Sequence, residues 1–95
     1  MKRFRIHEKS IQIKKVTMDE KMQMDVISTV VAALHMYGNE YTQMKKFIES
    51  KLNKLYLPTW HYIIGYDVDS SLLMPVQYLI SFKCEENNVT VFKTI

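Results

Sequence analysis

The spacing of apolar residues predicts two consecutive helices in the first half of the chain. Over residues 17–37 apolar side chains recur every three or four positions, which places them on one stripe of a helix. Thr17 and Glu20 have the spacing of an N-terminal capping box, and Gly38 supplies a stop at the other end. A second stripe predicts a helix over residues 40–55, ended by a proline. Its solvated face is expected to carry Lys45, Lys46, Glu49, Lys51 and Lys54.

The second half of the chain changes to the period of two that is typical of strands. Residues 60–64 are rich in aromatic and β-branched types and lie between Pro58 and Gly65, which favours a buried strand. Further strands are predicted over residues 66–73, 76–84 and 89–93, with a hairpin turn at 85–88 and a short edge strand at 11–16. This order of elements predicts an α+β domain, with two helices packed on one face of an antiparallel sheet.

Alternation in the last hairpin assigns its side chains to two faces. Those expected to face the helices are Tyr78, Ile80, Phe82, Cys84, Val89 and Val91. Those on the opposite face are Gln77, Leu79, Ser81, Lys83, Asn88, Thr90 and Phe92. This outer face mixes polar and apolar residues, which is typical of either a hydrated surface or a subunit or peptide contact.

Size and composition exclude several protein classes. The 95 residues form a single domain, and 47% hydrophobic with 24% charged residues is ordinary globular composition. No apolar run approaches the ~20 residues of a membrane span, and the basic start lacks the apolar stretch of a secretory signal. Cys84 is the only cysteine, which prevents an internal disulfide and fits a reducing, intracellular location.

The net charge of +3 and the pI near 9.0 do not predict nucleic-acid binding. Basic residues alternate with acids along most of the chain, whereas nucleic-acid proteins gather them in a patch. The densest basic group is Lys2, Arg3, Arg5 and Lys9, within residues 1–10. We expect these residues to form a disordered tail, which is either solvated or a binding arm.

No residue pattern predicts catalysis or a metal site. Cys84 with His7, His35 or His61 is the only nucleophile and base set, and Cys84 falls on the apolar face, where cysteine is inert. The histidines lack metal-ligand spacing. We therefore expect no enzyme activity and no cofactor. His61 is either a packed histidine with a fixed partner or a group that titrates at a strand interface.

Residues 58–65, Pro-Thr-Trp-His-Tyr-Ile-Ile-Gly, resemble the central strand of the smallest class of dynein light chains, type 1. The resemblance extends over about residues 11–93. Residues 18–25 are similar to the start of the family's first helix, and residues 91–93 resemble its closing strand. The order of helix, helix, Pro-Thr-Trp-His strand and meander is also the same.

The resemblance implies a homodimer in which one strand crosses over to complete the partner's sheet. An extended client peptide then adds beside that strand by β-augmentation. It implies a non-catalytic light-chain subunit of a dynein motor that acts as a peptide-binding hub. The implied location is cytoplasmic and on the microtubule cytoskeleton, with a cilium or flagellum axoneme as the other setting. The alternative is a specialised axonemal or structural light chain that has lost general client binding.

The resemblance also implies partners and contact residues. The partners are a second copy of the chain and the dynein intermediate chain or other disordered peptides, without nucleic acid or membrane. Residues 11–95 form the light-chain domain. The client contacts are Val68, Asp69, Ser70, Ser71, Leu72, Leu73, Met74, Leu79, Ser81, Lys83, Asn88 and Thr90. The dimer contacts are Trp60, His61, Tyr62 and Tyr66. Only Ser70 is retained from the family's crossing strand, so the recognition chemistry is altered while the scaffold is kept.

Overall fold

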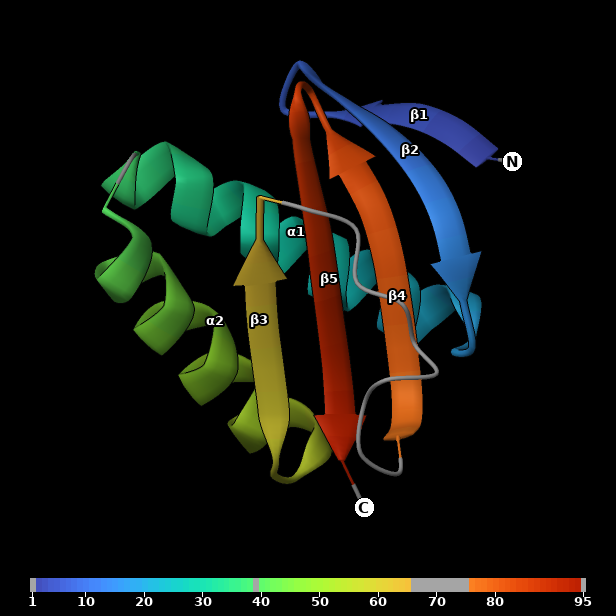
Figure 1. The fold of residues 1–95 in the computed structure, drawn as a ribbon, viewed down its shortest axis with the longest axis vertical. Helices are drawn as coiled ribbons and strands as arrows, with labels where there is room; N and C mark the ends of the chain where they lie inside the picture. The colour runs from blue at the N-terminus through green and yellow to red at the C-terminus, as the bar shows by residue number, and fades with distance from the viewer. Residues whose placement is uncertain (1, 39, 66–75, 95) are drawn as a thin grey trace.

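A computed structural model describes residues 2–38, 40–65 and 76–94 of the chain. This part holds two helices that cover one face of a five-stranded sheet (Figure 1). The elements are β1 (Lys2–Ile6), β2 (Lys9–Val16), α1 (Glu20–Tyr37), α2 (Tyr41–Tyr56), β3 (Trp60–Ile64), β4 (Val76–Cys84) and β5 (Asn87–Thr94). The strand order is β1-β2-β4-β5-β3, and every neighbouring pair is antiparallel. The α+β class is confirmed, and the strand predicted over residues 66–73 lies outside the described residues.

The N-terminal residues form part of the sheet, which corrects the prediction of a disordered tail. Strand β1 pairs with β2 across a two-residue turn at His7 and Glu8. Their φ angles of 47° and 67° are typical of a type I′ hairpin turn. Phe4 and Ile6 pack against the core from β1. Because β1 covers it, β2 is an interior strand and not the predicted edge strand.

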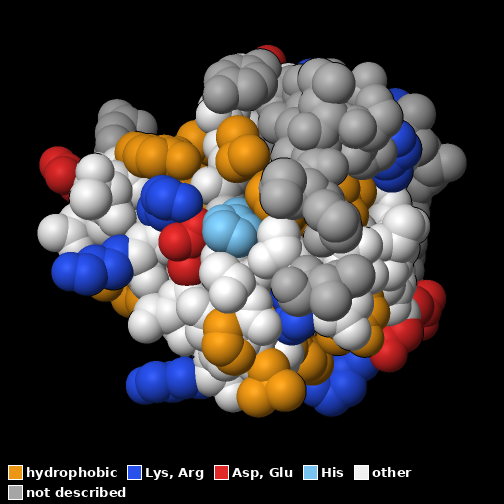
Figure 2. All heavy atoms as spheres, turned by 60° about the horizontal axis from the view of Figure 1, so that its bottom comes forward, with side chains coloured by type: hydrophobic (Ala, Val, Ile, Leu, Met, Phe, Trp, Pro, Cys, Tyr) orange, Lys and Arg blue, Asp and Glu red, His pale blue; other side chains and the backbone are white. Residues whose placement is uncertain are grey.

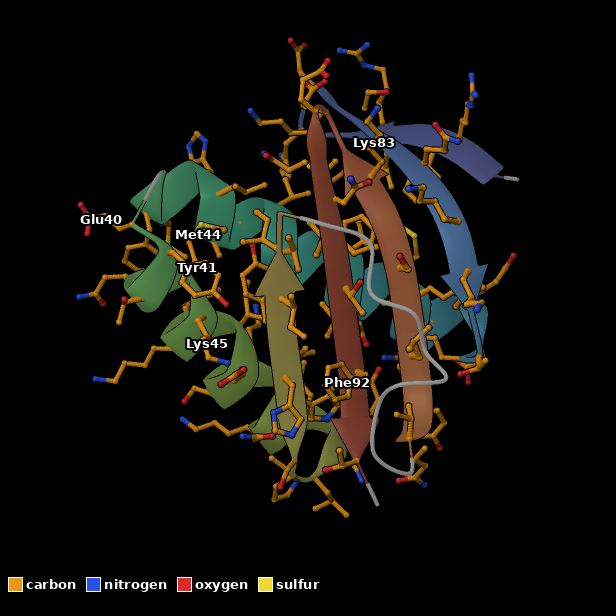
Figure 3. All side chains as sticks on the ribbon, viewed as in Figure 1. Glu40, Tyr41, Met44, Lys45, Lys83 and Phe92 are labelled. Atoms are coloured by element: carbon orange, nitrogen blue, oxygen red, sulfur yellow. The ribbon has the colours of Figure 1, made fainter. Side chains whose placement is uncertain are left out.

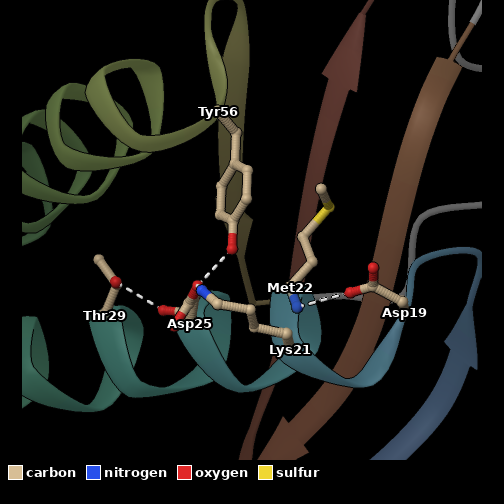
Figure 4. A network of polar contacts seen from close by, with 6 residues as sticks. All are labelled: Asp19, Lys21, Met22, Asp25, Thr29 and Tyr56. Carbon is tan, nitrogen blue, oxygen red and sulfur yellow. Dashed lines mark hydrogen bonds and ion pairs between the residues drawn. The ribbon is translucent and has the colours of Figure 1, made fainter.

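The start of α1 differs in detail from the predicted capping box. Asp19 is the N-cap, and its Oδ1 accepts the Met22 N–H at 2.8 Å (Figure 4). The Thr17 hydroxyl instead accepts the Leu79 N–H at 3.0 Å, and the Thr17 N–H donates to the Leu79 carbonyl at 2.8 Å. Thr17 therefore fastens the end of β2 to β4. Gly38 ends α1 as predicted, with a φ of 57° that glycine adopts without strain.

The hydrophobic core lies between the helices and the inner face of the sheet. The strand residues predicted to face the helices are buried there, with Tyr78 partly buried at the margin. The largest fully buried side chains are Trp60, Tyr62, Phe82, Ile11, Ile27, Ile48, Leu52 and Ile80. The inner face predicted from alternation is therefore confirmed.

A polar contact fastens the end of α2 to α1. The Tyr56 hydroxyl donates to the Asp25 carboxylate, and the Lys21 ammonium lies 2.9 Å from the same carboxylate (Figure 4). The bond from Tyr56, and then that from Lys21, lowers the pKa of Asp25. The same carboxylate raises the pKa of the Tyr56 phenol. Tyr56 is the last residue of α2, so this contact sets where the chain enters β3.

Candidate functional site

The predicted client-contact residues of β4 and β5 share the sheet face opposite the helices. The register forms three rows across the two strands: Ser81 with Thr90, Lys83 with Asn88, and Leu79 with Phe92, which was not among the predicted contacts. Phe92 and Lys83 mark the apolar and the polar end of this face (Figure 3). The structure therefore brings together the predicted residues of the described strands. The predicted contacts at residues 68–74 lie outside the described residues.

The rows on this outer face differ in burial. Leu79, Ser81 and Thr90 keep only 4%, 9% and 1% of their surface exposed. Lys83 and Asn88, in the polar row, are partly exposed. The Thr90 hydroxyl has no hydrogen-bond partner among the described residues. The middle of the outer face is thus buried within the chain, whereas its polar end is partly exposed.

The predicted dimer-contact residues of β3 divide between the two faces of the sheet. His61 lies on the outer face, where its ring stacks on Phe92 with 4.9 Å between centroids. The side chains of Trp60 and Tyr62 are 1% and 0% exposed in the core, so only their backbone groups can meet another chain. Tyr66 lies outside the described residues. At the end of the molecule where β3 begins, charged, apolar and histidine side chains are intermixed on the surface (Figure 2).

Strand β3 is an edge of the sheet, and its outward backbone groups are engaged by side chains of α2. The Trp60 N–H donates to Asn53 Oδ1 at 2.9 Å, and the Tyr62 N–H donates to Glu49 Oε2 at 3.0 Å. The Tyr62 carbonyl accepts the Tyr41 hydroxyl at 3.3 Å. An unpaired strand edge normally offers such groups to another strand. Here one helix occupies them.

The geometry of α2 explains how it reaches this edge. Glu49 and Asn53 are four residues apart, a rise of about 6 Å along a helix. Tyr62 and Trp60 are two residues apart, about 6.6 Å along a strand. These two spacings match, and α2 runs antiparallel to β3. Glu49 and Asn53 can therefore accept from successive outward N–H groups of the strand. Tyr41 and Lys45 continue the same side of α2 (Figure 3).

These α2 residues were not predicted as part of the site. Lys45 and Glu49 were predicted on the solvated face of the helix, whereas both are partly buried beside β3. Lys45 forms an ion pair with Glu49, and the Tyr41 ring stacks on Tyr62 at 5.9 Å. The signal in the sequence is the spacing of four between residues 41, 45, 49 and 53. It runs beside the apolar stripe of Met44, Ile48 and Leu52.

The candidate nucleophile Cys84 and the candidate base His61 lie on opposite faces of the sheet. Cys84 is buried on the inner face, and burial raises the pKa of its thiol. His61 lies on the outer face, while His7 and His35 line a pocket between the β1–β2 turn and α1. Within the described ranges, no group of three or more histidine, cysteine or acidic residues could hold a metal. No helix of the same ranges has the length and apolarity to cross a membrane.

Comparison with known proteins agrees with this architecture. The chain matches the family model for dynein light chain type 1 over residues 10–94. It is 30% identical over 86 residues to a probable dynein light chain 2, cytoplasmic, of Caenorhabditis elegans, covering 90% of this chain and 94% of the relative. Its fold is similar to the dynein light chain-like domain of a Fasciola hepatica calcium binding protein. That likeness has a TM-score of 0.77 at 17% identity and covers 94% and 95% of the two chains. Strand β1 precedes the residues matched by the family model.

Proposed function

Because this chain belongs to the dynein light chain type 1 family, we propose that it is a non-catalytic light-chain subunit of a dynein motor and a homodimeric hub for extended peptides. Its partners are a second copy of the chain and the dynein intermediate chain or other disordered client segments. The setting is the cytoplasm, on the microtubule cytoskeleton.

The outer edge of β3 carries the proposal. The Trp60 N–H, the Tyr62 N–H and the Tyr62 carbonyl of this edge are bonded to side chains of α2 and not to a strand. Each such hydrogen bond is worth about 0.5–1.5 kcal/mol net. An incoming strand supplies several backbone bonds in register and buries alternate side chains at the same time. A strand from a second copy can therefore replace the side chains of α2.

The outer face beside this edge suits a strand contact. His61 and Ile63 are partly exposed on it, and the His61 ring stacks on the buried Phe92. Alternate side chains of an added strand would lie beside His61 and Ile63. The others would point toward Tyr41 and Lys45 of α2.

The free energy needed to open the β3 edge is expected to depend on Glu49. In the Glu49→Ala variant the Tyr62 N–H loses its partner within the chain, so less energy opposes the incoming strand. We expect the dimer dissociation constant to fall about 2–10-fold, the equivalent of one net hydrogen bond. Glu49→Gln keeps an acceptor oxygen and should stay near wild type. Sedimentation equilibrium measures all three proteins.

The matched control is Glu86→Ala, which removes the same charge from the exposed turn between β4 and β5. It should leave the dimer unchanged. A monomer at tens of micromolar for both wild type and Glu49→Ala would overturn the proposal that β3 accepts a partner strand.

A structural light chain without general client binding is the second candidate. It is favoured by Leu79, Ser81 and Lys83, which stand where the family's groove floor is aromatic. Titration with Thr-Gln-Thr-like peptides separates the two functions. Micromolar binding supports the hub, whereas a dimer that binds no peptide of the panel supports the structural role.

A further inference from the structure

A groove lies between the end of α1 and the side of α2 that faces away from β3. Its volume is about 480 Å³, and its lining includes Lys46, Lys51 and Lys54, the rings of Tyr37 and Phe47, and otherwise uncharged polar side chains. Among the described residues, no carboxylate lines it. The lysines are exposed and the two rings are partly buried. The groove therefore has cationic walls and an aromatic floor.

We propose that this groove binds an acidic polypeptide segment that inserts one aromatic or large aliphatic side chain. The floor is a tilted ring pair with 5.9 Å between the centroids of Tyr37 and Phe47. Partly exposed aromatic rings in a concavity are typical anchors for a partner's apolar side chain. Carboxylates on either side of that side chain would then meet the lysines on the walls.

The charges around the groove favour an anionic partner over an uncharged one. Among the described residues, Lys46, Lys51 and Lys54 form no ion pair, whereas Lys45 on the other side of α2 pairs with Glu49. The Lys51 ammonium instead lies 5.8 Å from the centroid of the Phe47 ring. Lys51 also helps to lower the pKa of Asp25 on α1, after Tyr56 and Lys21. A carboxylate could pair with Lys51 in the groove without breaking an ion pair among the described residues. Complementary charge of this kind raises association rates and selects the sign of the partner.

The number of cations favours a peptide over a nucleic acid. Proteins that bind nucleic acid typically contact about six to ten phosphates along a continuous basic surface. This groove offers three lysines around one apolar floor. Such a site fits a short segment with one anchor residue.

This site is independent of the proposed strand addition. Glu49 and Asn53, which close the β3 edge, lie on the opposite side of α2 from the groove. A partner can therefore occupy the groove whether or not β3 is paired. Loss of one interaction would leave the other measurable.

The test uses a short fluorescent peptide of alternating glutamate and aspartate with a central tryptophan, titrated with the full chain. A double variant, Lys46→Glu with Lys51→Glu, should weaken binding about 10-fold or more, because two attractive contacts become repulsive. The control, Arg3→Glu with Arg5→Glu, makes the same charge change on β1 and should alter binding less than about 3-fold. A peptide with alanine in place of tryptophan should bind about 10-fold more weakly, as expected for the loss of a buried anchor.

Three results would overturn the proposal. The first is equal binding by wild type and the Lys46→Glu, Lys51→Glu variant. The second is equal binding of the tryptophan and alanine peptides, which would show that charge alone attracts the peptide. The third is a single-stranded oligonucleotide that binds more tightly than the peptide and is displaced by the same double variant. Circular dichroism of each variant verifies that the fold is intact.

Discussion

The two edges of the sheet are shielded from other strands in different ways. At one edge, β1 presents Arg3 and Arg5, both exposed, and charged side chains on an edge strand oppose pairing with any other strand. At the other edge, β3 is covered by hydrogen bonds from Glu49, Asn53 and Tyr41. Repulsion by charge acts on every strand that approaches. Hydrogen bonds from side chains can be exchanged for a backbone that fits, so the β3 edge is the one suited to a specific partner.

The edges also differ in how deeply they are packed. In β3, Trp60 and Tyr62 are fully buried, and Trp60 stacks on Tyr78 at 6.4 Å between centroids. In β1, Phe4 and Ile6 only adjoin the core. We infer that β3 is an integral part of the core, whereas β1 is an addition to it.

The largest expected effect is on stability, when the aromatic side chain that packs each edge strand against the core is truncated. Trp60→Ala leaves a cavity in the core and should lower the free energy of unfolding by about 3–5 kcal/mol, against a typical domain stability of about 5–15 kcal/mol. Phe4→Ala should cost about 1 kcal/mol, because the ring is only partly buried. Urea unfolding followed by circular dichroism measures both, since Trp60 is the only tryptophan and fluorescence is lost with it.

Equal losses in the two variants would contradict the difference between the edges. Leu57→Ala is a control for nonspecific loss of apolar surface, because Leu57 is 72% exposed between α2 and β3. It should change stability by less than about 0.5 kcal/mol.

A smaller effect is expected where α2 is fastened to α1. Tyr56→Phe removes the hydroxyl that donates to Asp25 and should cost about 1–2 kcal/mol at neutral pH. The pKa of Asp25 is lowered in the folded chain, first by Tyr56 and then by Lys21. The stability that this carboxylate contributes is therefore present above its ordinary pKa of 3.8 and is lost as pH falls through the lower, folded value.

The pH dependence separates this contact from simple packing. Unfolding by urea at pH 7 and at a pH well below the lowered, folded pKa of Asp25 should show that Tyr56→Phe differs less from wild type in acid, because both proteins then carry a protonated Asp25. A constant difference at both pH values would show that Tyr56 acts by packing alone. Asp25→Asn should resemble acidified wild type at neutral pH.

The buried parts of the fold could be predicted because several signals agree there. Pro58 and Gly65 bracket a run of aromatic and β-branched residues, and β3 occupies residues 60–64 as predicted. The inner face of β4 and β5 followed from alternation alone. Strand β1 was missed because its turn at His7 and Glu8 lacks the glycine that normally marks a type I′ turn, and because charged termini are usually mobile.

The candidate site was predicted only in part because it depends on tertiary distances. The outer-face residues followed from the period of two, but the partners of the β3 edge did not. Thr17 and Asp19 are both residue types favoured at a helix N-cap. Asp19 takes that position, because the Thr17 hydroxyl accepts the Leu79 N–H instead. Glu49 has the composition of a solvated helix face, and only the closeness of α2 to β3 makes it a partner of Tyr62.

The smallest expected effect concerns the charged edge. Arg3→Thr with Arg5→Thr removes two charges from β1 while keeping residues that suit a strand, so the free energy of unfolding should change by less than about 0.5 kcal/mol. Self-association should nevertheless rise at low ionic strength, because the repulsion that shields the edge is gone. In about 1 M salt the Debye length falls to ~3 Å, so wild type should associate as much as the variant does. Light scattering over a salt series measures this convergence.

Lys46→Thr with Lys54→Thr, which removes the same charge from α2, is the control and should not associate at low salt. If it associates as strongly as the β1 variant, net charge and not edge protection keeps the chains apart.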